Sequence, residues 1–333
     1  MGLEAIKLID EGKYDEAILL LDNAQKLAPE SIEYPYEIAY VYFMKGDYNE
    51  AMQFLEPLLE HPEVNDKIYQ LLGKTYSQLE DFEKETLIYE AGLKIFPNSG
   101  TLCLESGITQ MMKKDFDKAI YFFERGIKVE PQLISNYYWA TRIFCKSSEK
   151  VWGLIYGEIF LNIERNSDRT REISKLLYET YINGVEVGEN GFSLNYSRGA
   201  TYKFDSIPDN AIPLYFGTEI YTPLLFRCLE NDPVIDIHAL NKIRTCFIKS
   251  YFQKYGQTLP NPLFEYQEKL RVEGHLEAYN YWVLSGGDNQ GFYDWYQNNN
   301  DKWGDFLKWF TTPENVIGIN KDSYFIRENQ IYK

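Results

Sequence analysis

The chain of 333 residues has few basic residues and few histidines. Its 34 Lys and Arg are outnumbered by 50 Asp and Glu, and the formal net charge is −16 at pH 7. Because binding to nucleic acid depends on Lys and Arg that neutralise phosphates, this charge argues against a nucleic-acid partner. The three histidines, His61, His238 and His275, form none of the spacings that hold a metal. The sequence therefore predicts no metal and no other cofactor.

Cysteines and long apolar runs are also scarce. The four cysteines form no CxxC pair and lie in apolar stretches, so Cys103, Cys145, Cys228 and Cys246 are predicted to be buried free thiols. The best apolar run, at 151–163, is shorter than the roughly 18 residues of a membrane span and contains Glu158, so no membrane insertion is predicted. The first residues resemble no signal peptide. The cellular compartment stays open.

Patterns of known catalytic sites are missing too. GxSxG, P-loop and dinucleotide glycine patterns do not occur, and the glycine-rich stretch 285–291 follows a helical segment, which favours a loop over a phosphate cradle. Among 50 acidic residues, a carboxylate pair such as Glu265 and Glu268 identifies no site. The sequence predicts no catalytic residue and a protein that is not an enzyme. A hydrolase with an unrecognised carboxylate site is a distant alternative.

What the sequence does contain is one phrase repeated every 34 residues. The copies are EGKYDEA at 11–17, KGDYNEA at 45–51, LEDFEKE at 79–85 and KKDFDKA at 113–119, whereas SSEKVWG at 147–153 no longer matches. In the copy at 66–99, apolar residues follow helical spacing on both sides of the phrase, and Pro97 follows the second stretch. Each copy therefore predicts two antiparallel helices. Gly73 and Gly92 should let them approach closely, with Tyr76, Phe82 and Tyr89 between them.

These residues resemble the tetratricopeptide repeat, a 34-residue helix pair with small and aromatic residues at set positions. The resemblance is clear over 1–133 and weak over 134–166, which we read as a degenerate fifth pair. It implies a mainly α protein, an α-solenoid that forms a right-handed superhelix of antiparallel helix pairs. Glu85 stands where other copies have Ala, so the third pair should pack differently, and Pro57 should kink the second helix of its pair. By the phase of the repeat, the first helix is expected to be either simply short or trimmed at its start, which leaves an exported protein open.

The first helices of such an array line its concave face, where members of this family commonly hold a peptide or partner helix. Two alternatives follow: the face binds a partner segment, or the C-terminal half of the chain covers it. The early positions Gly2 and Ile6 lack the Asn or Lys of those members that bind chaperone carboxylates. The candidate groove residues are Tyr36, Tyr40, Phe43, Met44, Lys67, Gln70, Lys74, Gln78, Leu104, Ile108, Met111, Met112, Tyr138, Arg142 and Lys146.

Beyond residue 167 the pattern changes. We predict a repeat array at 1–166 and an α-rich domain of unrecognised family at 167–333. The second domain should contain helices at 170–185, 232–256 (starting at Asp232-Pro233), 261–287 and 301–310, a small β-hairpin at 191–205 about an Arg198-Gly199 turn, and a strand or two in 315–332.

The stretch 279–310 contains eleven aromatic residues among its 32 residues. Such rings suit short helices that face a core, and they equally suit stacking on a sugar. The predicted function is a protein–protein interaction scaffold or adaptor that binds a peptide or partner segment. The alternative is binding of a carbohydrate or other small ligand by the aromatic-rich domain, with the repeats serving assembly. The partner's identity and the oligomeric state stay open.

Overall fold

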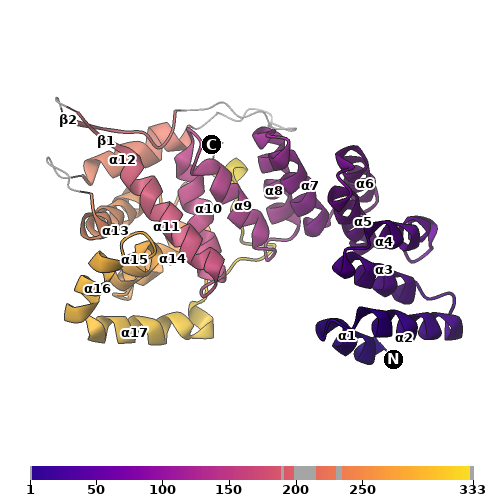
Figure 1. Cartoon of the computed structure of the whole chain (residues 1–333). Helices are drawn as coiled ribbons and strands as arrows, with labels where there is room; N and C mark the ends of the chain where they lie inside the picture. Colours follow the sequence, from indigo (N-terminus) through magenta and orange to yellow (C-terminus); the bar gives the residue numbers. More distant parts are fainter. Residues whose placement is uncertain (1, 189–190, 199–214, 230–234, 331–333) are drawn as a thin grey trace. The chain divides into compact units, whose positions relative to one another are not determined.

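The computed structural model describes residues 2–188, 191–198, 215–229 and 235–330 (Figure 1). The chain divides into two compact units, Met1–Val129 and Glu130–Lys333, which we call unit 1 and unit 2. The boundary predicted after residue 166 marks where the repeat pattern ends, which differs from the division into compact units. It stays a prediction. None of the described helices is both long and apolar enough to cross a membrane.

The described part of unit 1 consists of four helix pairs. The first helices are α1 (Gly2–Asp10), α3 (Glu33–Lys45), α5 (Asp66–Gln78) and α7 (Gly100–Met112). The second helices are α2 (Tyr14–Leu27), α4 (Tyr48–Leu55), α6 (Phe82–Ile95) and α8 (Phe116–Val129). The second helices begin at intervals of 34 residues, as the repeat predicts. After α4 the chain continues as a short 3-10 helix, Glu56–Glu60, so the α-helix ends at Leu55, just before Pro57, where the sequence predicted a kink within the helix.

The repeated phrase forms the turn inside each pair. Gly12, Gly46, Glu80 and Lys114 occupy the same position in four copies, and all have left-handed backbones, with φ between 60° and 87°. In each turn the next residue donates its N–H to a carbonyl five residues back, which closes the end of the first helix. These bonds are Lys13 to Leu8 (2.8 Å), Asp47 to Tyr42, Asp81 to Tyr76 and Asp115 to Gln110 (2.9 Å each). The turn needs this conformation, which glycine adopts without strain in two of the copies.

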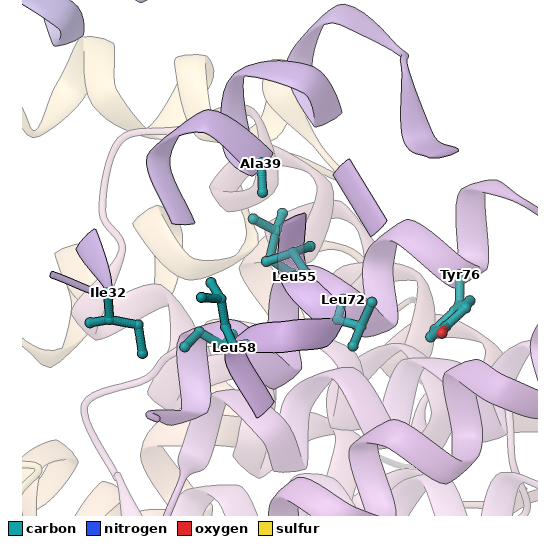
Figure 2. Close-up of a cluster of buried hydrophobic side chains, with 8 residues drawn as sticks. Ile32, Ala39, Leu55, Leu58, Leu72 and Tyr76 are labelled. Atoms are coloured by element: carbon teal, nitrogen blue, oxygen red, sulfur yellow. The ribbon is translucent and has the colours of Figure 1, made fainter. Parts of the chain in front are cut away.

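Small residues on the first helices face large residues on the second. Ala39 lies beside Leu55 in one buried cluster (Figure 2). The next copies have Gly73, where an added Cβ would come within 2.2 Å of the Tyr89 ring, and Gly107, where it would come within 2.4 Å of Phe123. Where the second helix has a ring in place of Leu55, the first helix has Gly in place of Ala39, so the packing stays dense in each copy. This confirms the predicted close approach at Gly73.

Unit 2 is also mainly helical. Its helices are α9 (Ser135–Phe144), α10 (Lys150–Ile163), α11 (Asp168–Asn183), α12 (Thr222–Arg227), α13 (Ile237–Lys254), α14 (Pro262–Val272), α15 (Leu276–Leu284), α16 (Asn289–Asn298) and α17 (Asn300–Thr311). A π-helix at Phe216–Tyr221 precedes α12, and 3-10 helices lie at Pro313–Asn315 and Arg327–Gln330. The predicted fifth pair corresponds to α9 and α10, which pack against each other and against α11.

A two-stranded antiparallel hairpin follows α11, as the fold class predicts, but at a different place. β1 (Val185–Gly188) pairs with β2 (Gly191–Leu194), and Val185 lies opposite Leu194. The prediction had extended the helix through Val185 and therefore missed the first strand. It placed the turn at Arg198-Gly199, and residues 199–205 lie outside the described part of the chain.

Three further predictions need correction. The stretch 261–287 is not one helix, because Gly274 has a left-handed backbone (φ 85°) that ends α14 before α15 starts. Asp236 caps α13 by accepting a hydrogen bond from the Ala239 N–H, while Asp232 and Pro233 lie outside the described residues. Within residues 315–330 the structure has a single isolated bridge, Asn320 to Ser323, and no strand. The buried Phe325 instead anchors this tail beside the Tyr156 ring, at 5.4 Å.

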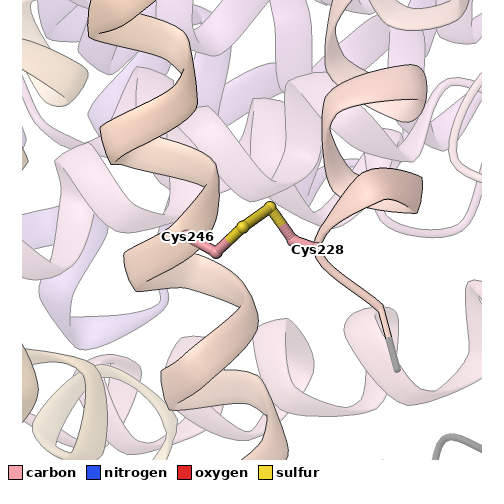
Figure 3. The surroundings of a disulfide bond; sticks show 2 residues. All are labelled: Cys228 and Cys246. Atoms are coloured by element: carbon pink, nitrogen blue, oxygen red, sulfur yellow. A yellow bond between two sulfur atoms is a disulfide. The ribbon is translucent and has the colours of Figure 1, made fainter. Parts of the chain in front are cut away.

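The cysteine prediction is wrong for two of the four residues. Cys228, just after α12, forms a disulfide with Cys246 of α13, and their Cα atoms are 5.7 Å apart (Figure 3). Both are half-buried. Cys103 and Cys145 are buried free thiols, as predicted. The pairing escapes sequence reasoning because it depends on how two helices pack, and the residues themselves form no recognisable spacing.

Candidate partner-binding face

The first helices of unit 1 lie against one another, α3 on α5 and α5 on α7. Three predicted groove residues of α3, Tyr36, Tyr40 and Phe43, are half-buried and pack against the core between the second and third pairs. Met44, one helical position further on, is 46% exposed. The predicted groove residues of α3 therefore contribute both to the core and to the exposed face.

A cavity of about 410 Å³ lies between α1, α3 and α5. Of the predicted groove residues, it brings Tyr36 and Lys67 together. Its other lining residues are Ala5, Ile6, Ile9, Leu21, Ile32, Glu33, Tyr34, Glu37, Asn65 and Ile68. Most of this lining is apolar, and Ile6 is 50% exposed although it lies at the cavity. Such a concave, largely apolar site with a few polar groups is typical of a binding site.

Sequence reasoning missed the contribution of α1. Ile6 and Ile9 lie three residues apart on α1 and both line the cavity. Their helical spacing was a usable signal. The absence of Asn and Lys at Gly2 and Ile6 excludes a carboxylate site on this helix, but it does not exclude an apolar one.

Two ionisable groups at the cavity, Tyr36 and Glu37, are partly shielded from solvent, whereas Glu33 and Lys67 are exposed. Burial raises the pKa of Glu37, the Lys67 ammonium opposes that effect, and the neighbouring Glu33 carboxylate reinforces it. Burial and then the Glu37 carboxylate raise the pKa of Tyr36 to about 12. Tyr36 is therefore a neutral phenol at physiological pH, with a hydroxyl that can donate a hydrogen bond.

Further along the face, two of the four predicted groove residues of α5 already have a partner. The Lys74 ammonium lies 2.8 Å from the Glu105 carboxylate, and the Gln70 amide donates to the same oxygen at 2.8 Å. Lys67 and Gln78 are exposed. On α7, Leu104, Ile108 and Met111 are half-buried and Met112 is 60% exposed. In the middle of the face, Glu105 of α7 thus binds both Gln70 and Lys74 of α5.

Glu85 confirms that the third pair packs differently from the others. It is buried on α6, and its carboxylate accepts a hydrogen bond of 2.7 Å from the Thr109 hydroxyl of α7. Burial raises the pKa of Glu85, which means that the folded chain holds this carboxylate at a cost. Alanine at the equivalent position of the other copies avoids that cost.

The last three groove residues belong to unit 2. The Tyr138 hydroxyl donates to the Glu172 carboxylate of α11 at 2.7 Å, and Arg142 donates to the Tyr138 oxygen at 2.9 Å. Tyr138 is 6% exposed, whereas Lys146 is exposed. At α9, therefore, α11 covers part of the face that the sequence assigned to the groove.

Five of the eleven rings of the stretch 279–310 are buried in the core of unit 2, and five more are half-buried. Tyr279, Phe306 and Phe310 are buried, and Tyr281 stacks on the buried Trp295 with ring centroids 4.3 Å apart. Tyr293 is 54% exposed. Binding of a carbohydrate stays a prediction, and the burial of these rings gives it no support.

The described residues contain no group of three or more His, Cys, Asp or Glu that could hold a metal ion.

A polar cavity of about 650 Å³ lies in unit 2 between the start of α11 and the end of α15. Its lining includes Arg165, Arg171, Trp282 and Ser285. Arg165 is directed at the Phe310 ring, 3.7 Å from its centroid, and donates to the Asn162 carbonyl at 2.8 Å.

Comparison with known proteins confirms the resemblance in the N-terminal part. Sequence models of the tetratricopeptide repeat match residues 8–75 and 66–99. A relative from Arabidopsis thaliana, cell division cycle protein 27 homolog A, is 28% identical over 93 residues, which are 28% of this chain and 13% of that protein. The chain therefore spans a small part of the relative that it matches.

Two solved structures share a helical likeness with the chain. The crystal structure of MamA is 18% identical, with a TM-score of 0.42, over 48% of this chain and 94% of that one. YrrB, described as a TPR protein with an unusual peptide-binding site, is 16% identical, with a TM-score of 0.34, over 54% of this chain and 84% of that one.

Proposed function

We propose that this chain, whose residues 8–99 match the tetratricopeptide repeat, is a protein–protein interaction scaffold that binds a segment of a partner protein on the first helices of unit 1. The match supports an interaction scaffold in general. The observation that supports this particular face is the largely apolar cavity between α1, α3 and α5. The proposal assigns no catalytic step to the chain.

The size of the cavity suits a side chain of a partner. Its volume of about 410 Å³ has room for more than one large aliphatic side chain. Burying one Leu or Ile side chain contributes about 1.5–3 kcal/mol. One such anchor supplies a weak interaction, and further contacts along the face, for example at Met44 and Met112, would add to it.

The experiment compares two exposed aliphatic residues on helices of unit 1. Ile6, at the cavity, is 50% exposed, and Leu87, on α6 and outside the cavity lining, is 56% exposed. The full chain is used to capture a partner, and the purified partner is then titrated against wild type, Ile6→Ser and Leu87→Ser.

We expect Ile6→Ser to weaken binding about tenfold, because one apolar contact of about 1.4 kcal/mol is lost. Leu87→Ser should leave affinity unchanged. Equal affinities for Ile6→Ser and wild type would contradict the proposed face. These single positions make a cleaner test than Tyr40 and Phe43, whose rings also pack on the core.

A further inference from the structure

Acidic residues are concentrated at the N-terminal end of unit 1. Residues 1–70 contain 15 Asp and Glu but only 5 Lys and no Arg, whereas residues 71–129 contain 9 Asp and Glu and 8 Lys and Arg. The cavity between α1, α3 and α5 lies in the acidic part, since all its lining residues fall within 5–68. A negative potential at a concave site attracts positively charged partners and raises their association rate.

The same asymmetry appears within the cavity. Glu33 and Glu37 lie one helical turn apart on α3, and Lys67 is the one basic residue among the lining residues. Neither carboxylate forms an ion pair with a residue in the described part of the chain. Burial disfavours the charge of Glu37, Lys67 offsets part of that effect, and Glu33 adds to it, so a further cation placed beside the two carboxylates would be favourable.

Besides a positive charge, a ligand of this cavity needs an apolar group, because the remaining lining residues are mostly aliphatic. Ile6 and Ile9 of α1 and Ile68 of α5 line the cavity together with Ile32 at the start of α3. A ligand must therefore combine an apolar group that fits among these residues with a positive charge that reaches the two carboxylates. Both features occur together in a peptide that has an aliphatic residue next to Lys or Arg.

We propose that the cavity between α1, α3 and α5 binds a basic peptide segment, with an aliphatic side chain among Ile6, Ile9 and Ile68 and a flanking Lys or Arg beside Glu33 and Glu37. This inference rests on the proposed function and names the class of its partner. A second copy of the chain is a poor occupant, because a net charge of −16 on each copy opposes self-association.

The test uses the full chain and three fluorescein-labelled synthetic peptides of equal length. All three have leucine and alanine at the same positions and carry lysine, glutamine or glutamate at the others. Binding is followed by fluorescence anisotropy between about 50 and 200 mM NaCl, a range over which interactions between exposed charges are increasingly screened.

We expect the lysine peptide to bind about tenfold more tightly than the glutamine peptide at low salt, since each exposed charge pair contributes about 0.2–1 kcal/mol. This advantage should shrink as salt rises, and the glutamate peptide should bind most weakly. Glu33→Gln combined with Glu37→Gln should reduce the affinity for the lysine peptide about tenfold and leave that for the glutamine peptide unchanged.

The control combines Glu83→Gln with Glu90→Gln, which removes the same charge from exposed positions on α6 outside the cavity lining. An equal loss in this control would overturn the proposal, because attraction would then come from overall charge. So would equal affinities for the lysine and glutamine peptides, or sedimentation that shows a dimer lost on Ile6→Ser. A partner that depends on Ile6 but not on Glu33 and Glu37 would refute the basic segment and leave the proposed function intact.

Discussion

Unit 1 and unit 2 are both helical, but their interiors are held together in different ways. In unit 1, a small residue on each first helix meets a large one on the second helix of the same pair, as Ala39 meets Leu55 and Gly73 meets Tyr89. In unit 2, the core encloses the ion pair of Glu158 and Arg244, which comes from helices far apart in the sequence. In unit 1 each helix pair contacts mainly its neighbours, so a pair can expose one face without disturbing the rest of the array. In unit 2 several helices share one buried network, so none of them can be exposed separately.

The network of unit 2 is almost completely buried. Arg244 donates to both carboxylate oxygens of Glu158, at 2.6 and 2.8 Å, and to the Asn280 oxygen and the Tyr181 hydroxyl at 2.8 and 2.9 Å. Burial works against the charge of Arg244, but the Glu158 carboxylate raises its pKa above the ordinary value. Arg244 therefore keeps its charge in the buried interior, because it faces Glu158. Unit 2 therefore has a fixed interior, and unit 1 presents an exposed face.

The largest expected effect concerns this ion pair. Arg244→Met leaves the Glu158 carboxylate buried without its counter-charge and should lower the free energy of unfolding of unit 2 by about 3–5 kcal/mol. Urea unfolding followed by tryptophan fluorescence measures it, since all six Trp residues lie in unit 2. The double variant Glu158→Leu with Arg244→Met should recover part of the loss. Additive losses in the double variant would show that the two charges are not coupled.

The disulfide is the next feature that distinguishes unit 2. Cys228 and Cys246 lie 18 positions apart in the sequence, so Cys228→Ser with Cys246→Ser should lower stability by about 3 kcal/mol through the greater freedom of the unfolded chain. The tryptophan-detected midpoint in urea should fall in this variant, and in wild type after reduction. An unchanged midpoint with and without reductant would contradict the bond's stabilising role.

A smaller effect should appear in unit 1. Gly73→Ala places a methyl group 2.2 Å from a ring carbon of Tyr89 and should destabilise α5 and α6 by about 1–3 kcal/mol. Hydrogen exchange resolved along the chain measures the change in those two helices. Gly304→Ala on α17 is the matched control, since no atom lies within 4 Å of its added Cβ, and it should stabilise its helix by about 0.5–1 kcal/mol.

Tyr89→Leu should rescue Gly73→Ala, because the pair then resembles Ala39 with Leu55 in the preceding copy. A failure of this rescue, with Tyr89→Leu alone being no worse than the double variant, would refute the proposed small–large complementarity within each pair.

The smallest effect is a pH dependence at Glu85. Burial raises the pKa of this carboxyl in the folded chain above its unfolded value, so the folded state binds the proton more tightly. Its contribution to stability is therefore lost as pH rises from about 4.3, the ordinary Glu value, through the raised pKa. Glu85→Gln keeps an oxygen for the Thr109 hydroxyl and should stabilise unit 1 by less than about 1 kcal/mol near neutral pH.

This gain from Glu85→Gln should shrink at acidic pH, when both variants are neutral at this position. Urea unfolding followed by circular dichroism at about pH 4, just below the ordinary pKa of Glu, and at about pH 8 compares the two conditions. A gain that is the same at both pH values would show that ionisation of Glu85 carries no cost.

The sequence predicted unit 1 far better than unit 2, because the contacts inside unit 1 are local in the sequence and those inside unit 2 are not. The helices of unit 1 meet within each 34-residue copy, so the spacing of Tyr14, Tyr48, Phe82 and Phe116 was enough to place them. The pairing of Glu158 with Arg244 spans 86 residues, and no periodic pattern connects them. In the sequence, Glu158 stands out only as the one charged residue within the apolar stretch 151–163.

The candidate face was predictable in part. Tyr36 and Lys67 were assigned to it and do lie at the cavity, while Ile6, Ile9, Glu33 and Glu37 were not assigned. The position of a residue within the repeat identifies the helix face that it occupies. It does not reveal how far neighbouring helices separate, and that separation creates the cavity.

The most direct test of the central claim is hydrogen exchange on the full chain, with and without a captured partner or the lysine peptide. Binding at the cavity should slow exchange in α1, α3 and α5, at residues 2–10, 33–45 and 66–78, and leave exchange in α13 to α17 unchanged. Slower exchange confined to unit 2, with α1, α3 and α5 unaffected, would contradict that claim.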